Sequence, residues 1–257
     1  MHYHRVKMSR KTQSNSVVHR VIEIILLFQD GQQAFTVDEI SRTLDLPKST
    51  TYRLVRILQE SGLLAKADTS HYQLGAAFMR LSRAALNSNR DIRLMALPAM
   101  QRIAESVLES VSLMRIINKQ VVCIESVEGQ HALRVSIEQG RIQPLYAGAS
   151  SRVLLAHLPE SEWPEYLQFP LKRFTSNTII DYDTLKDDLH AVRRDGYAVS
   201  DGEIDVGARA VAVPLYNNRD EVVAALSIEA PAMRMPSDVV ARYVAILREE
   251  AQNIRNK

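Results

Sequence analysis

The sequence predicts an α+β protein with two domains, and three observations support this fold class. The chain has 257 residues, which is enough for two domains of ordinary size. Hydrophobic residues recur at helical spacing over most of the first 110 residues, and short β-rich runs separated by turns follow. Helical segments flank these runs and hairpins replace regular crossovers, so the sheet is expected to be largely antiparallel.

Two short helices joined by a tight turn are predicted in the N-terminal third of the chain. The first is expected over Val37–Thr43, with Thr36 as its N-cap and Glu39 placed to complete a capping box. After a three-residue interruption, Pro47 opens a second helix that ends at Ser61. This pattern is typical of a helix-turn-helix.

The second of these helices combines an apolar face with a basic and hydroxyl-rich one. Its apolar face is predicted to contain Tyr52, Leu54, Val55, Ile57 and Leu58. Short hydroxyls can approach base edges, and Arg and Lys neutralise phosphates or pair with guanine, so the other face suits the major groove of DNA. A merely solvated charged face is the alternative that this helix alone leaves open. The candidate DNA contacts are Thr36, Lys48, Ser49, Thr50, Thr51, Arg53, Arg56 and Lys66.

Neighbouring segments favour the DNA-binding interpretation. Residues 63–66 and 71–74 predict two strands around a polar turn, a hairpin from which Lys66 and His71 could touch the DNA backbone. A third helix is expected between Ser16 and Asp30. Its packed face is predicted to contain Val18, Val21, Ile22, Ile25 and Phe28. Three helices and a hairpin make a winged helix-turn-helix.

Charge is distributed unevenly along the chain, although the overall net charge is only +2. Residues 1–90 contain 13 Lys and Arg against 7 Asp and Glu, whereas residues 91–257 contain 19 against 23. The basic excess therefore lies in the part assigned to DNA. Residues 1–14 include no acidic residue and predict a disordered basic arm, which either follows the phosphates or the minor groove or has no role.

Composition excludes several other classes of protein. The single cysteine, Cys123, cannot form an intrachain disulfide and favours a reducing, cytoplasmic compartment. No apolar run approaches the roughly 18 residues of a membrane span, and the N-terminus lacks a signal peptide's apolar core. His2 and His4 without further ligands do not predict a metal site, and no cofactor is expected.

The remainder of the chain predicts a linker helix and an α+β domain. Residues 76–90 are expected to form the linker helix between a domain at 15–75 and one at 91–257, and this helix could also carry a subunit contact. The strands expected in the second domain are 112–117, 121–127, 133–137, 210–215 and 222–228. Its expected helices are about 92–110, 151–157, 160–168, 183–194 capped by Asp183 and stopped by Gly196, and 237–253.

Five segments resemble the isocitrate-lyase-regulator (IclR) family of bacterial transcription factors, in the same order and at similar spacing. They are LPKSTTYRLVRILQESGLL at 46–64, YQLG at 72–75, PLYAGASSRVLLAHLP at 144–159, DGYAVSDGEIDVGARAVAVPLYN at 195–217 and VVAALSIEAP at 222–231. The resemblance implies a winged-helix domain, a linker helix and a GAF-like effector domain. It also implies dimers or tetramers that respond to small organic or aromatic carboxylates.

The resemblance implies an effector pocket lined by Gly148, Ala149, Ser150, Asp201, Glu203, Arg209, Ala210, Ser227 and Glu229. The residues themselves support part of this set. A Gly-Ala-Ser turn at a helix start offers N–H groups to an anion. Ser227 and Glu229 alternate along a strand and therefore share a face. Arg209 either pairs with a ligand carboxylate or braces Asp201 or Glu203 within the fold.

Two positions depart from the pattern of the family. Ala210 stands where many members have a cysteine or serine, and Glu229 stands where a small polar residue is common. A carboxylate at position 229 repels a second anionic group unless it is protonated or paired. A ligand with a donor or a cationic group opposite Glu229 is therefore expected.

We expect a sequence-specific DNA-binding transcriptional regulator that is controlled by a small acid and is not an enzyme. Its expected partners are a double-stranded DNA operator, the small-molecule effector and further copies of the chain in a homodimer or homotetramer. An enzyme would use Asp201, Glu203 and Asp205, or Cys123 with His157, but nothing in the sequence sets their geometry. A C-terminal domain that only assembles subunits is the other alternative.

Overall fold

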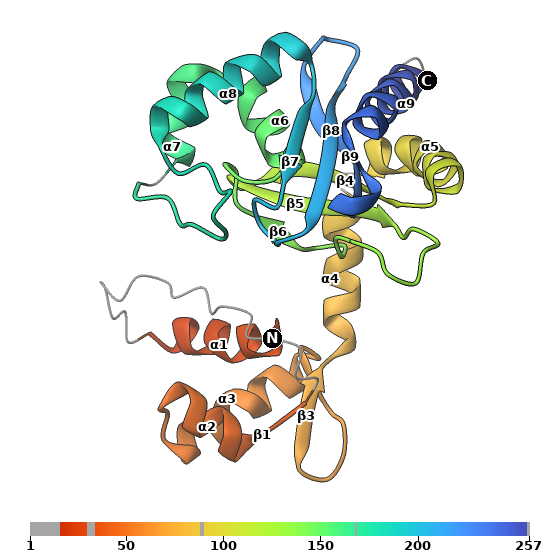
Figure 1. Ribbon diagram of the computed structural model, residues 1–257. Helices are drawn as coiled ribbons and strands as arrows, with labels where there is room; N and C mark the ends of the chain where they lie inside the picture. Colours follow the sequence, from red (N-terminus) through yellow and green to blue (C-terminus); the bar gives the residue numbers. More distant parts are fainter. Residues whose placement is uncertain (1–15, 30–33, 88–89, 168, 256–257) are drawn as a thin grey trace. The chain divides into compact units, whose positions relative to one another are not determined.

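The computed structural model describes residues 16–29, 34–87, 90–167 and 169–255 (Figure 1). The predicted basic arm, with His2 and His4, lies outside these residues. Contacts between Cα atoms divide the chain into two compact units, residues 1–88 and 89–257. Within the described part of the chain, no helix is both long enough and apolar enough to cross a membrane.

The N-terminal unit contains three helices, a small sheet and a fourth helix that follows them (Figure 1). Its elements are α1 (Val17–Leu26), η1 (Leu27–Gln29), β1 (Phe35–Thr36), α2 (Val37–Leu44), α3 (Lys48–Glu60), β2 (Leu64–Lys66), β3 (His71–Leu74) and α4 (Ala76–Asn87). Strands β2 and β3 form the predicted hairpin, and β1 pairs with the other edge of β3. This arrangement confirms the winged helix-turn-helix. The two-residue strand β1 was not predicted, because it is too short to show an alternating pattern.

The turn between α2 and α3 agrees closely with the sequence prediction. The capping box is confirmed, since the Thr36 N–H donates to Glu39 Oε2 (2.7 Å) and the Glu39 N–H donates to Thr36 Oγ1 (3.2 Å). Asp45 ends α2 with a left-handed φ of 52°. Pro47 is the N-cap of α3, one position before the expected first turn, and Gly62 follows the helix with φ 73°.

The packed face of α1 was predicted only in part. Ile24 is fully buried and Phe28 is nearly so, whereas Val18 and Ile22 are 68% and 47% exposed. Apolar residues occupy almost every position from 21 to 28, so spacing alone could not select the face that packs. In α4, Leu81 is also exposed.

The C-terminal unit is built on one antiparallel sheet of six strands. Its elements are α5 (Arg90–Val107), β4 (Ser110–Ile117), β5 (Gln120–Val127), β6 (Ile142–Gln143), α6 (Ala149–His157), η2 (Glu160–Glu162), α7 (Trp163–Tyr166), α8 (Tyr182–Asp195), β7 (Ala198–Asp201), β8 (Ala208–Tyr216), β9 (Val222–Pro231), η3 (Ala232–Arg234) and α9 (Ser237–Arg255). The strand order is β6-β5-β4-β9-β8-β7. The predicted α+β class with an antiparallel sheet is confirmed.

Helices cover both faces of this sheet, with α5 and α9 on one side and α6, α7 and α8 on the other (Figure 1). Side chains alternate along the strands, so Val211 and Val213 of β8 pack toward α5 and α9 while Ala212 packs toward α6 and α8. The two resulting cores hold the edges of the sheet and the start of α6 in fixed positions. These elements carry the site described below.

Three expectations for this unit were wrong. Residues 133–137 are not a strand, because β5 pairs with β6 at Ile142 and Gln143 instead. Asp181, and not Asp183, caps α8 by accepting the Thr184 N–H at 2.9 Å. The segment predicted as a helix over 160–168 consists of a 3-10 turn and the four-residue α7. Strand β7 was missed, while the stop of α8 at Gly196, with φ 71°, is confirmed.

Candidate functional site

The exposed face of α3 carries four side chains at helical spacing. Ser49, Tyr52, Arg53 and Arg56 lie at positions i, i+3, i+4 and i+7, and all four are exposed. Tyr52 is 58% exposed, so its prediction as a core residue was wrong, as was that of Ile57, which is 48% exposed. The buried face contains Thr51, Leu54, Val55 and Leu58.

Two residues of the predicted DNA-binding set are engaged inside the fold. Thr51 is fully buried and its hydroxyl donates to the Pro47 carbonyl at 3.2 Å, so its side chain does not belong to the exposed face. The Thr36 hydroxyl donates to Glu39 Oε2 at 2.9 Å and accepts the Glu39 N–H. The Thr36 N–H and the Thr36 hydroxyl both donate to the Glu39 carboxylate and hold the pKa of Glu39 below its usual value. Thr36 therefore serves the capping of α2.

The cations of this surface differ in how far they are already paired. Lys48 pairs with Asp38 at 2.9 Å and Arg56 pairs with Glu60 at 2.8 Å, all four side chains being more than half exposed. Arg53 makes no ion pair or hydrogen bond with the described residues, and its side chain is exposed. Exposed pairs contribute little free energy and exchange readily for other partners. Arg53, Lys48 and Arg56 are thus all available to phosphates or base edges.

The tip of the wing is ordered by Asp68. Its carboxylate accepts the N–H groups of Ser70 and His71, each at 2.8 Å, and lies 2.8 Å from His71 Nδ1. These bonds hold the pKa of Asp68 well below its usual value. His71 thus faces Asp68, while Lys66 is exposed on β2.

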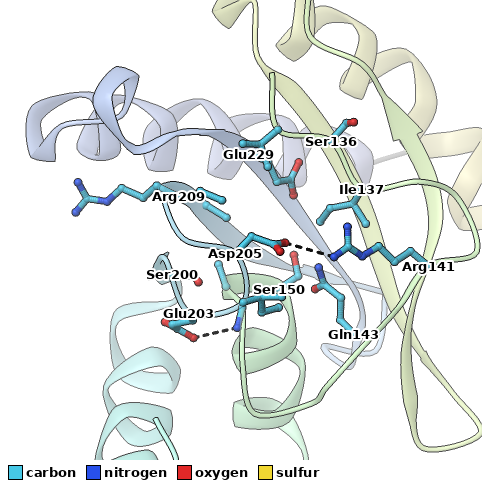
Figure 2. Close-up of a pocket in the computed structure, with 16 residues that line it drawn as sticks. Ser136, Ile137, Arg141, Gln143, Ser150, Ser200, Glu203, Asp205, Arg209 and Glu229 are labelled. Carbon is cyan, nitrogen blue, oxygen red and sulfur yellow. Dashed lines mark hydrogen bonds and ion pairs between the residues drawn. The ribbon is translucent and has the colours of Figure 1, made fainter. Parts of the chain in front are cut away.

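A cavity in the C-terminal unit encloses about 520 Å³ of empty space, part of it open to solvent. Seven residues of the predicted effector set lie on its wall: Gly148, Ala149, Ser150, Glu203, Arg209, Ala210 and Glu229. Asp201 and Ser227 do not line it. Asp201 pairs with Arg209 at 3.6 Å, and Ser227 is fully buried beneath the wall. Figure 2 shows Glu229, Arg141 and Gln143 directed toward a common space, while the Arg209 guanidinium points away from it.

The N-terminus of α6 is occupied by a carboxylate of the same chain. The Gly148 N–H donates to Glu203 Oε2 at 3.0 Å, and Arg152 donates to Glu203 Oε1 at 2.6 Å. Arg152, itself 3% exposed, also pairs with Asp188 at 2.5 Å and donates to the Val199 carbonyl. Burial raises the pKa of Glu203, and the Arg152 charge opposes that shift. The Gly148 N–H that was expected to bind a ligand anion is therefore engaged by Glu203.

Three serines and Glu229 form a buried cluster at the other side of the cavity. Glu229 Oε1 accepts the hydroxyls of Ser112 at 2.6 Å and Ser227 at 2.5 Å, and the Ser150 hydroxyl donates to Ser227 at 2.8 Å. The expectation that Ser227 and Glu229 share a face is thus confirmed. Burial raises the pKa of Glu229 to about 7, and the two hydroxyl donors oppose that shift.

Sequence reasoning missed Arg141, which supplies the guanidinium inside the cavity. Arg141 Nη2 lies 3.4 Å from Asp205 Oδ2, and its side chain is 29% exposed. Gln143, Ser200 and Asp205 also line the cavity and were not predicted to bind a ligand. Arg141 lies outside the five segments that carry the family resemblance, so it did not enter the predicted effector set.

Cys123 and His157, which were considered as a nucleophile and its base, each contact other groups. Cys123 is buried, its thiol faces the Glu125 and Ile137 carbonyls, and its pKa is raised to about 12 mainly by burial. His157 instead contacts the Val153 carbonyl and the Tyr216 hydroxyl. Among the described residues, no group of three His, Cys, Asp or Glu side chains is placed to hold a metal ion.

The winged helix-turn-helix followed by an α+β unit with a cavity defines a class of DNA-binding transcriptional regulators. Residues 17–68 match the IclR helix-turn-helix domain, and residues 84–256 match the C-terminal domain of bacterial transcriptional regulators of the IclR type. The chain belongs to the IclR family.

Named relatives and solved structures agree with this assignment. The HTH-type transcriptional regulator KipR of Bacillus subtilis is 30% identical over 245 residues, covering 95% of this chain and 97% of KipR. The HTH-type transcriptional repressor AllR of Escherichia coli is 30% identical over 239 residues, covering 92% of this chain and 88% of AllR. These relatives are named as regulators, in agreement with the expectation that the chain is not an enzyme.

Among solved structures, Thermotoga maritima IclR superposes with a TM-score of 0.78 at 28% identity, covering 93% of this chain and 97% of that one. An IclR homologue from Microbacterium hydrocarbonoxydans, crystallised in complex with 4-hydroxybenzoate, has a TM-score of 0.81 at 30% identity. That match covers 94% of this chain and 98% of the homologue.

Proposed function

We propose that this regulator reads an operator through α3 and that a small organic acid in the C-terminal cavity controls this binding. DNA binding is assigned to residues 15–75, a linker to residues 76–90, and effector binding with oligomerisation to residues 91–257. Residues 1–14 form a basic arm in this proposal. The operator contacts are Lys48, Ser49, Thr50, Tyr52, Arg53, Arg56 and Lys66.

The observation that carries the ligand proposal is the guanidinium of Arg141 inside a cavity of about 520 Å³. Arg141 is only loosely held by Asp205, at 3.4 Å. A ligand carboxylate can therefore replace Asp205 and pair with the Arg141 guanidinium in the forked geometry that guanidinium groups favour. The relative that was crystallised with 4-hydroxybenzoate supports a carboxylate ligand.

In this proposal the ligand controls DNA binding by shifting the population between two arrangements of the chain. A ligand that binds one arrangement of the chain more tightly than another changes the fraction that can engage the operator. Winged helices generally act in pairs on two half-sites, so a homodimer or homotetramer is part of this proposal. Light scattering of the purified chain tests it, and a monomer at all concentrations contradicts it.

The experiment measures operator binding and thermal stability with and without candidate acids. Duplexes are first selected from a random library with the full-length protein, and affinity is then followed by fluorescence anisotropy. We expect 4-hydroxybenzoate, or another small aromatic or aliphatic acid, to change operator affinity at least five-fold and to raise the melting temperature by mass action.

Arg141→Met is the test variant and Arg173→Met is the matched control, because Arg173 is exposed and does not line the cavity. The first variant should lose the ligand response and keep operator affinity, and the second should keep both. If no acid shifts the melting temperature, the C-terminal unit only assembles subunits and the ligand proposal fails.

A further inference from the structure

Glu229 lines the cavity and has one carboxylate oxygen without a hydrogen-bond partner among the described residues. Its Oε1 accepts two hydroxyls, while Oε2 is buried and has no hydrogen-bond partner among the described residues. Glu229 is 2% exposed and lines the cavity, and Figure 2 shows its carboxyl group directed toward the space that Ile137 and Arg141 also border. A buried polar atom of this kind costs free energy unless something binds it.

The protons of the serine cluster are already used. Each serine hydroxyl has one proton to donate. Ser112 and Ser227 both donate to Oε1, at 2.6 and 2.5 Å, and Ser150 gives its proton to Ser227 at 2.8 Å. No hydroxyl of the cluster remains for Oε2.

The charged and titratable groups around the cavity have partners other than Glu229 Oε2. Arg141, next to β6, pairs with Asp205 of the β7–β8 loop, and Arg209 of β8 pairs with Asp201 and donates to the Met235 carbonyl at 2.8 Å. Glu203 of the same loop is held by Arg152. On β5, the raised pKa of Cys123 keeps its thiol neutral. None of these groups supplies a donor to Oε2.

We propose that the ligand carries a hydroxyl or ammonium group that donates a hydrogen bond to Glu229 Oε2, in addition to the carboxylate that faces Arg141. The ligand class is therefore a hydroxy or amino acid in the chemical sense, and not a simple monocarboxylate or dicarboxylate. This inference rests on the proposed function, because it names the chemistry of the effector of the same cavity.

The direction of the pH dependence follows from the state of Glu229. Its pKa is about 7, so it is largely protonated at pH 6 and largely ionised at pH 8. A ligand donor prefers the ionised carboxylate. Affinity should therefore increase from pH 6 to pH 8, with a proton released on binding at the lower pH.

The experiment is calorimetry on the full-length protein with matched acids that differ only in the donor group. The probes are 3-hydroxybutyrate and 4-aminobutyrate against butyrate, and 3-hydroxybenzoate against benzoate, at pH 6 and pH 8. We expect at least one donor-bearing acid to bind about ten-fold or more tightly than its parent, as a hydrogen bond to a charged group allows.

Glu229→Gln keeps the shape of the side chain and presents an amide that does not ionise. It should remove the preference for the donor-bearing acid and its pH dependence. Glu249→Gln, at an exposed position of α9, is the matched control and should change neither.

Equal affinity of parent and donor-bearing acids overturns the inference, as does an affinity that decreases with pH or one that Glu229→Gln leaves unchanged. Butyrate or benzoate that changes operator affinity as strongly as its donor-bearing counterparts would leave the proposed function standing while the inference fails. If none of the five acids binds, the inference is overturned, and an operator unaffected by any small acid removes the proposed function as well.

Discussion

Single residues decide what each unit can bind, and Glu229 and Arg53 illustrate opposite situations. Arg53 is a cation at the surface without a partner among the described residues, so a phosphate or base edge meets it without displacing another group. Glu229 is an acid in the interior with one oxygen satisfied and one not. Arg53 is therefore available to bind an anion, whereas burial raises the pKa of Glu229.

The buried Glu229 makes the stability of the C-terminal unit depend on pH. Its pKa is about 7 in the folded chain against an ordinary value of 4.5, so the folded state binds more protons between these values and wild-type stability decreases as pH rises through that window. Glutamine does not titrate. Between pH 5 and pH 8, Glu229→Gln should therefore gain roughly 2 to 3 kcal/mol of unfolding free energy relative to wild type.

Urea unfolding of the full-length protein, followed by a probe in the C-terminal unit, measures this difference. Glu249→Gln should track wild type at both pH values. A constant difference between Glu229→Gln and wild type would show that Glu229 titrates normally.

At the scale of elements, the sequence predicted features that depend on neighbouring residues, but not features that depend on residues far apart in the chain. The capping box of α2 and the stop of α8 depend on residues within four positions of each other, and both were predicted. The N-terminus of α6 is filled by Glu203, which lies 55 residues from its partner Gly148. Only the pairing of β7 with β8 and the packing of α6 bring these two residues together. Spacing along the chain therefore could not predict this hydrogen bond.

The buried face of a helix was predicted best where polar residues separate it from the exposed face. This holds for Leu54, Val55 and Leu58 of α3. Tyr52 was nevertheless assigned to the core, because an aromatic ring suits either environment. In α1 the apolar run is nearly continuous, and the face was wrong in part. Arg141 was missed because it lies outside the segments that carry the family resemblance, and its place depends on which segment pairs with β5.

The capping box makes α2 a test of local stability within the DNA-binding unit. Thr36→Ala removes a hydroxyl that accepts the Glu39 N–H, which should cost about 1 kcal/mol. Amides in the first turn of α2 should then exchange about five-fold faster in hydrogen-exchange mass spectrometry of the full chain. Thr43→Ala, at an exposed position of the same helix, is the control. Equal exchange in both variants would contradict a role of Thr36 in holding α2.

At the scale of the whole molecule, the two units differ in net charge and in the kind of site that each contains. Residues 1–90 carry 13 basic and 7 acidic side chains, in accordance with a unit that faces phosphates. The C-terminal residues have an acidic excess and contain the cavity. Each unit has its own buried core, so a change on the α3 face should leave ligand binding intact.

The central claim is that the exposed face of α3 reads DNA, and operator affinity of Arg53→Ala tests it most directly. Arg80→Ala removes the same charge from an exposed position of α4, in the same unit but away from that face. Affinity for the selected duplex is measured by anisotropy over a range of salt concentrations.

Arg53→Ala should bind about ten-fold or more weakly than wild type, with its fold and ligand binding unchanged, while Arg80→Ala should bind nearly as well as wild type. If Arg53 contacts a phosphate, the slope of log affinity against log salt should also decrease in magnitude by about 1. Wild-type affinity in Arg53→Ala, or an equal loss in Arg80→Ala, would contradict the assignment of α3 as the helix that reads the operator.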